Sequence, residues 1–171
     1  MRAALLFALI ACTVFVGARH VRAQSDAVQH WRRFVNKAGW VVRYPPGWDV
    51  GSCGQCTHPT DPNGFVTFYN PSSKELVMIE NLMDKPSDQS ARRWLDEVSR
   101  STVLNPRVSA NWIRLARTQA LEVVSRNGDA TESENFYLLH GSKTFAIRTP
   151  RNSPARRLIQ QMLSTFEFVD R

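Results

Sequence analysis

The clearest candidate for chemistry is a pair of cysteines, Cys53 and Cys56, with two residues between them. Such a pair can form a local disulfide, act as a redox-active dithiol or bind a metal. Thioredoxin-like chemistry needs the first cysteine at a helix start, where the helix dipole stabilises its thiolate. Residues 57–64 contain two prolines and a glycine, a pattern that predicts a loop. We therefore expect a structural disulfide in this loop, with a thiol–disulfide oxidoreductase as the alternative function.

A metal site is a third interpretation of the same loop. His58 and Asp61 follow the cysteines closely, and thiolate, imidazole and carboxylate groups suit zinc. The sequence holds no second CxxC pair and no HxxxH pair to complete four ligands. We expect no metal and no other cofactor, and a site formed by Cys53, Cys56 and His58 is the minor alternative.

A second cluster is basic and surrounds the start of the last predicted helix. It consists of Arg148, Arg151, Arg156 and Arg157. Guanidinium groups beside the free amides of a helix start can hold a phosphate or a carboxylate. The favoured interpretation is a solvated basic surface, and an anion site or contact with an anionic membrane surface is the alternative. The sequence has no GxSxG motif and no phosphate-binding loop, so we predict no catalytic residues.

The N-terminus has the pattern of an export signal. Arg2 precedes an apolar run over residues 3–16, and Val21 and Ala23 are small residues three positions and one position before a cleavage point. We expect residues 1–23 to be a signal peptide and the mature chain to begin at Gln24. Lipidation of Cys12 in a lipobox-like LIAC sequence is the alternative, which is disfavoured because the apolar run continues past that cysteine.

The charge balance is basic, with 22 Lys and Arg against 15 Asp and Glu. The expected signal peptide carries three of the arginines and no acid, so the mature surplus is mild. A mild surplus in an exported protein gives little reason to expect a nucleic-acid partner.

Short alternating segments and two helical ones must position these groups. The first helix is expected over residues 87–102, capped by Ser87 or Ser90. The last begins after Ser153, as N-cap, and Pro154, and should bury Leu158, Ile159, Met162 and Leu163. Strands are expected over residues 31–36, 40–44, 65–69, 76–80, 108–116, 119–125, 133–140, 143–149 and 166–169.

This order predicts an α+β fold with a mostly antiparallel sheet and at least two helices. The last strand should return to the edge of that sheet. The length of 171 residues fits one domain, which we place at residues 31–171 after a flexible lead-in over 24–30.

Residues 39–48, GWVVRYPPGW, resemble the opening signature of PsbP-like domains, in which an apolar strand ends in Tyr-Pro-x-Gly-Trp. The ending is also similar: strand residues 136–139, a Gly-Ser turn, strand residues 143–147, a helix and the strand residues 164–168. The resemblance implies an α/β/α sandwich, the fold shared by the photosystem II extrinsic protein PsbP and the Ran-binding import factor Mog. It also implies a protein that binds or assembles other proteins without catalysis. We therefore expect an exported binding or assembly module whose partner is an envelope protein.

Overall fold

The computed structural model describes residues 28, 30–51, 64–103 and 105–169. The expected signal peptide, Cys12, Cys53, Cys56 and His58 lie outside the described residues, so the predictions made for them stay predictions. Asp61 lies outside them as well.

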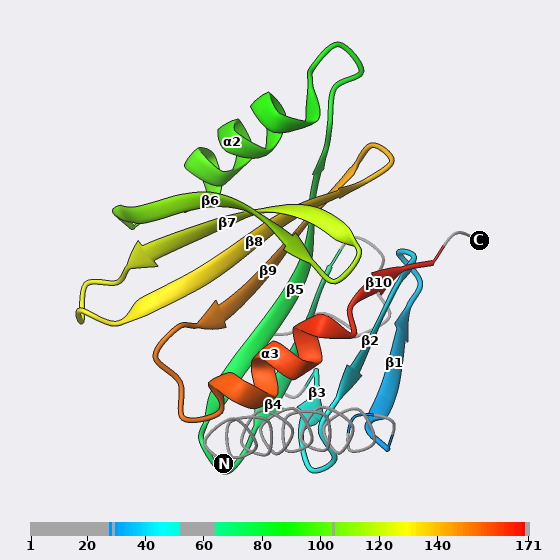
Figure 1. The fold of residues 1–171 in the computed structure, drawn as a ribbon, viewed down its shortest axis with the longest axis vertical. Helices are drawn as coiled ribbons and strands as arrows, with labels where there is room; N and C mark the ends of the chain where they lie inside the picture. Colours follow the sequence, from blue (N-terminus) through cyan, green and yellow to red (C-terminus); the bar gives the residue numbers. More distant parts are fainter. Residues whose placement is uncertain (1–27, 29, 52–63, 104, 170–171) are drawn as a thin grey trace, which may run out of the picture.

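A seven-stranded sheet dominates the fold, and all its neighbouring strands pair antiparallel (Figure 1). Its last four strands in sequence form consecutive hairpins. Across the sheet the order is β3 (Asp49–Val50), β4 (Phe65–Asn70), β5 (Glu75–Asp84), β9 (Lys143–Pro150), β8 (Glu132–His140), β7 (Thr118–Arg126) and β6 (Arg107–Leu115).

A second, three-stranded sheet contains β1 (Arg32–Asn36), β2 (Trp40–Tyr44) and β10 (Glu167–Phe168), in that order. The expectation that the closing strand joins the main sheet was wrong, since β10 pairs with β2. Residues 45–47, Pro-Pro-Gly, end β2, and Gly47 takes a φ of +88° that glycine adopts at little cost. The chain therefore turns there, and the first hairpin stays separate from the larger sheet.

Helix α2 (Ala91–Thr102) begins at Ser90, whose Oγ accepts a hydrogen bond from the Arg93 amide. This confirms one of the two predicted N-caps. Its buried side chains include Trp94, Leu95 and Val98. They pack against one face of the large sheet, on the side chains of Leu121, Val123, Tyr137 and Ala146.

Helix α3 (Arg156–Ser164) begins later than expected, with Ala155 as its N-cap. Ser153 Oγ accepts from the Ala155 amide at 2.9 Å, so Ser153 belongs to the turn before the helix. Ile159, Met162 and Leu163 are buried as predicted, but Leu158 is 37% exposed. The reason is geometric: each helical residue turns by about 100°, which puts Leu158 beside the buried stripe.

The two helices pack on opposite faces of the large sheet, because successive strand residues face opposite sides. On β8, Tyr137 belongs to the α2 cluster, whereas Phe136 and Leu138 belong to the cluster that contains α3 and β2. The α+β class and the antiparallel sheet are thereby confirmed. The α/β/α sandwich implied by the resemblance stays a prediction, since the α3 side also carries the small sheet.

The buried face of α3 gives a test of this packing. Ile159→Ala should lower the free energy of unfolding by about 2–5 kcal/mol, because it leaves a cavity in the main core. Leu158→Ala is the matched control on the neighbouring position and should change it by about 0.5 kcal/mol or less. Urea unfolding followed by circular dichroism measures both, and equal losses for the two variants would contradict the described helix orientation.

Candidate functional site

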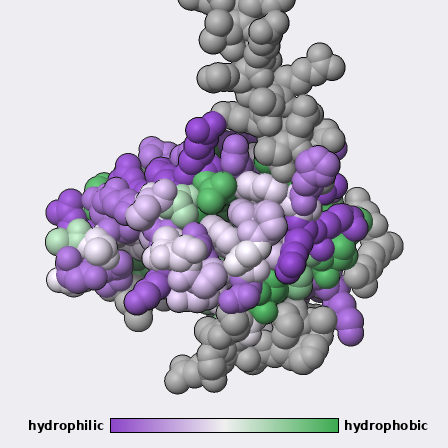
Figure 2. Space-filling view, turned by 90° about the horizontal axis from the view of Figure 1, so that it is seen from below, coloured by the Kyte–Doolittle hydropathy of each residue, from purple (hydrophilic) through white to green (hydrophobic). Residues whose placement is uncertain are grey.

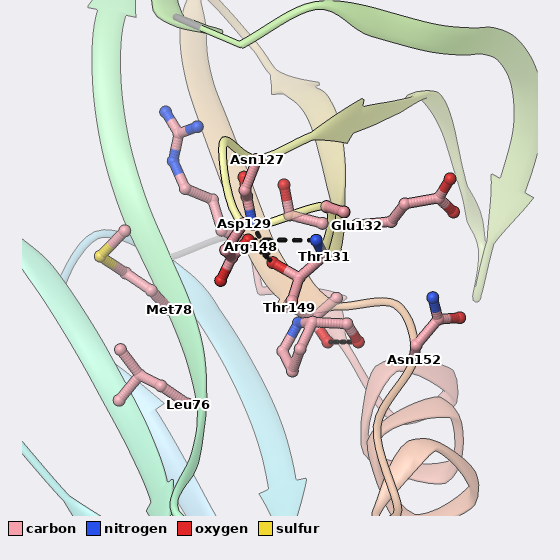
Figure 3. Close-up of a pocket in the computed structure, with 12 residues that line it drawn as sticks. Leu76, Met78, Asn127, Asp129, Thr131, Glu132, Arg148, Thr149 and Asn152 are labelled. Carbon is pink, nitrogen blue, oxygen red and sulfur yellow. Dashed lines mark hydrogen bonds between the residues drawn. The ribbon is translucent and has the colours of Figure 1, made fainter.

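A cleft of about 530 Å³ opens at the end of the large sheet where β7 turns into β8. Leu76 and Met78 of β5 lie on one side of it, and the turn residues lie on the other (Figure 3). The Arg148 side chain extends from β9 between the β5 side and the turn. Leu76 and Met78 share a face of β5, because strand residues two apart point the same way. The cleft therefore combines an apolar side with a polar wall.

A row of hydrogen bonds crosses four strands beside this cleft, and two of its members, Arg148 and Ser133, line the cleft. Arg148 Nε donates to Glu80 Oε1 at 2.5 Å, and Arg148 Nη1 donates to Asn135 Oδ1 at 3.2 Å. The Asn135 amide in turn donates to Ser125 Oγ at 3.3 Å, and Ser125 and Ser133 share a hydrogen bond of 2.9 Å. We call these five residues the polar ladder. It runs from β5 through β9 and β8 to β7.

Burial makes this ladder rigid. Asn135 and Ser125 are 3% and 2% exposed, and the Arg148 and Glu80 side chains are 25% and 19% exposed. A polar group at such depth costs about 1–3 kcal/mol when it loses its partner. Each member is therefore held in position by its neighbours, and Arg148 and Ser133 reach the cleft lining already fixed.

The wall of the cleft is a compact turn between β7 and β8. Asp129 accepts hydrogen bonds from the Thr131 amide at 3.0 Å and from Thr131 Oγ1 at 2.6 Å. Asn127 Nδ2 donates to the same hydroxyl oxygen at 2.8 Å. The hydrogen bonds from the Thr131 side chain and main chain lower the pKa of Asp129 below its ordinary value. The cleft therefore keeps a negative charge at this wall in mildly acidic solution.

The predicted arginine cluster is divided among several ion pairs. Arg151 contacts Glu132 at 2.8 Å, and Arg156 contacts Glu134 at 2.7 Å. Glu134 is a buried carboxylate, with 7% of its side chain exposed, and Arg151 also approaches it at 3.6 Å. These pairs tie β8 to the residues that precede and begin α3.

The four predicted arginines therefore do not share one environment. Arg148 belongs to the polar ladder, Arg151 and Arg156 pair with carboxylates of β8, and Arg157 is exposed on α3. Sequence reasoning missed the acidic partners because they lie 19 to 68 residues away along the chain. Binding of an external anion by this cluster stays a prediction.

Within the described residues, no three His, Cys, Asp or Glu side chains gather into a potential metal site. None of the helices described there is long and apolar enough to cross a bilayer. Trp40, Trp48 and Trp94 are buried. Trp112 is partly buried and packs against the α2 cluster.

No protein-family model and no curated protein matches this sequence. Solved structures do match its fold. A crystal structure from Bacteroides thetaiotaomicron has a TM-score of 0.55 and 17% identity, and the match covers 82% of this chain and 49% of that one. This chain thus spans about half the length of the Bacteroides protein. The solution structure of cyanobacterial PsbP (CyanoP) from Synechocystis has a TM-score of 0.53 and 14% identity, covering 80% of this chain and 91% of that one.

The class that this architecture defines is an α+β protein with an antiparallel sheet and helices on both of its faces. Within this class the chain has a PsbP-like fold, as its likeness to the structure of cyanobacterial PsbP shows. At these identities the likeness concerns the fold, and function has to be argued from the surface of this chain.

The wall of the cleft has a testable pH dependence. Because the folded pKa of Asp129 lies below its ordinary value of 3.8, its ionised form stabilises the turn above that value. This stabilisation is lost as the pH falls through the lower folded pKa. Thr131→Val should raise the pKa of Asp129 toward 3.8, because it removes a hydroxyl donor, whereas Thr131→Ser should preserve it. Carboxyl ¹³C NMR titration measures the midpoints, and equal values in Thr131→Val and the wild type would refute the role of the hydroxyl.

Proposed function

We propose that this protein is an exported, non-enzymatic binding module of the cell envelope, which holds a segment of a partner protein in the cleft beside β5. The observation that carries this proposal is the polar ladder, which fixes two residues of the cleft lining, Arg148 and Ser133. The groups of the ladder satisfy one another, so a partner meets these two side chains in fixed positions. Preorganisation of this kind lowers the entropic cost of binding.

The chemistry of the lining suits recognition. The Arg148 guanidinium and the Asp129 carboxylate each have partners within the protein, and Glu132 is shared between Arg126 and Arg151. Groups held in this way offer a ligand a surface of fixed shape with hydrogen-bonding groups in fixed positions. The lowered pKa of Asp129 makes this carboxylate a weaker base, whereas a general base works best with a pKa near the operating pH.

The proposed ligand is a short polypeptide segment with both apolar and polar groups. Leu76 and Met78 offer an apolar contact, and the turn residues Asn127 and Thr131 offer hydrogen bonds across the cleft. Seen from below, the surface is mostly hydrophilic, and hydrophobic residues form small separate patches (Figure 2). A patchy surface of this kind suits a local contact better than a broad apolar interface.

The test compares two exposed or partly exposed apolar residues, Met78 in the cleft and Val35 on β1. The mature protein is used to capture partners from the native envelope fraction, and calorimetry measures binding to the purified partner. Met78→Glu should weaken that binding at least about tenfold, which corresponds to about 1.4 kcal/mol. Val35→Glu, the matched control, should leave it unchanged.

Equal binding by both variants would reject the cleft as the site. Turnover of a model disulfide substrate that disappears in Cys53→Ser would replace the proposal with the oxidoreductase alternative. The exported state is checked on the native protein by intact mass, which should fit a chain that begins at Gln24. A mass that retains residues 1–23, or that contains a lipid on Cys12, would overturn that part of the proposal.

A further inference from the structure

The last strand of the large sheet, β6, has one open edge. The strand contains nine residues and pairs with β7 alone, and it lies at the outer margin of the sheet (Figure 1). The other terminal strands of the two sheets are shorter: β3 and β10 have two residues each and β1 has five. In the described part of the chain, β6 is therefore the longest row of main-chain groups that a further strand could extend.

The geometry of the hairpin identifies which groups point outward. Residues 116–117 form a two-residue turn that pairs Leu115 with Thr118, so these two residues exchange hydrogen bonds. Hydrogen-bonded and non-hydrogen-bonded residue pairs alternate along an antiparallel ladder. The amide and carbonyl groups of Ala110, Trp112 and Arg114 therefore point away from β7. Within the described residues, no other segment hydrogen-bonds to these outward groups.

The usual protection of an edge strand is weak along this stretch. Protein edges are commonly guarded by proline, lysine, a bulge or a covering segment. Residues 107–115 contain neither proline nor lysine, and the only irregularity of the β6–β7 pairing lies at its start, between Arg107 and Ser109. Ala110, Asn111 and Arg114 are exposed. The stretch 110–114 is thus regular, accessible and unprotected.

The positively charged side chains beside this edge determine the charge of the partner segment that fits it. Trp112 packs with the α2 cluster, and Arg114, two residues further on, shares its face. The Arg92 guanidinium of α2 lies 5.2 Å from the centre of the Trp112 ring. Neither Arg92 nor Arg114 has a carboxylate partner among the described residues.

The carboxylates near this face are already engaged. Asp96 pairs with Arg100 and Arg107, and Glu97 pairs with Arg93. Glu122, on the adjacent strand, lines a different pocket on the α3 side of the sheet. Two cations therefore remain available at the edge, and cross-strand pairs of opposite charge stabilise a sheet.

We propose that β6 binds an extended, acidic segment of a partner protein, which adds to the sheet as its eighth strand. Main-chain hydrogen bonds to Ala110, Trp112 and Arg114 supply the affinity, as in other cases of β-strand addition. Acidic side chains on the α2 face meet Arg92 and Arg114 and supply the selectivity. This edge does not include the cleft residues, so it can fail or succeed independently of the function proposed for the cleft.

The test uses a fluorescein-labelled peptide in which glutamate alternates with valine, and the full mature protein. Ala110→Pro removes one outward amide and no hydrogen bond to β7, a change that edge strands tolerate. It should weaken peptide binding, measured by anisotropy, at least tenfold, whereas Ala110→Thr retains the amide and should bind as the wild type does. Arg114→Glu should also weaken binding tenfold or more. Arg117→Glu, a matched charge reversal in the turn, should not.

Amide hydrogen exchange locates the contact in the wild type. Addition of the peptide should slow exchange at Ala110, Trp112 and Arg114 and leave the amides of β1 unchanged. The proposal is overturned if the peptide does not bind at millimolar concentration, or if the same peptide with lysine in place of glutamate binds as tightly. It is also overturned if β6 serves only as an interface between two copies of this chain. In that case Ala110→Pro dissociates the dimer, and neither Ala110→Pro nor Arg114→Glu changes peptide binding.

Discussion

The hydrogen bonds of Arg148 hold together the part of the large sheet that α2 does not cover. Helix α2 packs on Leu121, Val123, Tyr137 and Ala146, and beyond that cluster the same sheet face carries polar side chains. An unpaired guanidinium or amide at this depth would be costly. The contacts of Arg148 with Glu80 and Asn135 remove that cost and connect three neighbouring strands. We expect the part of the sheet beyond the α2 cluster to depend on this connection.

The same constraint fixes two polar residues of the candidate site, Arg148 and Ser133, in the lining of the cleft. Ion pairs between β8 and the start of α3 continue the polar network on the opposite face of the sheet, through Glu134 and Arg156. The apolar core beneath is filled by aromatic side chains such as Phe68, Phe136 and Phe145. The scaffold is thus rigid in the core between the strands. The two surface features that can recognise a partner, the cleft and the free edge of β6, lie at the end and at the edge of the large sheet.

The sequence predicted most of the individual elements, because alternation and helical spacing are local signals. It failed where pairing is long range. The separation of β1, β2 and β10 from the main sheet follows from contacts such as Glu167 with Val41, which no local pattern reveals. The arginines were recognised as a cluster, but Glu80 is 68 residues from Arg148. The resemblance, which rests on strand and turn patterns, therefore predicted the fold and no site residue.

The most direct test of the polar ladder is a double-mutant cycle on Glu80 and Arg148, measured by urea unfolding of the mature protein. The single variants Glu80→Gln and Arg148→Met each remove one side of the pair, and the double variant removes both. If the ladder holds the part of the sheet beyond the α2 cluster, the losses of unfolding free energy are non-additive, with a coupling of at least about 1 kcal/mol. Losses that add within about 0.5 kcal/mol would contradict the account.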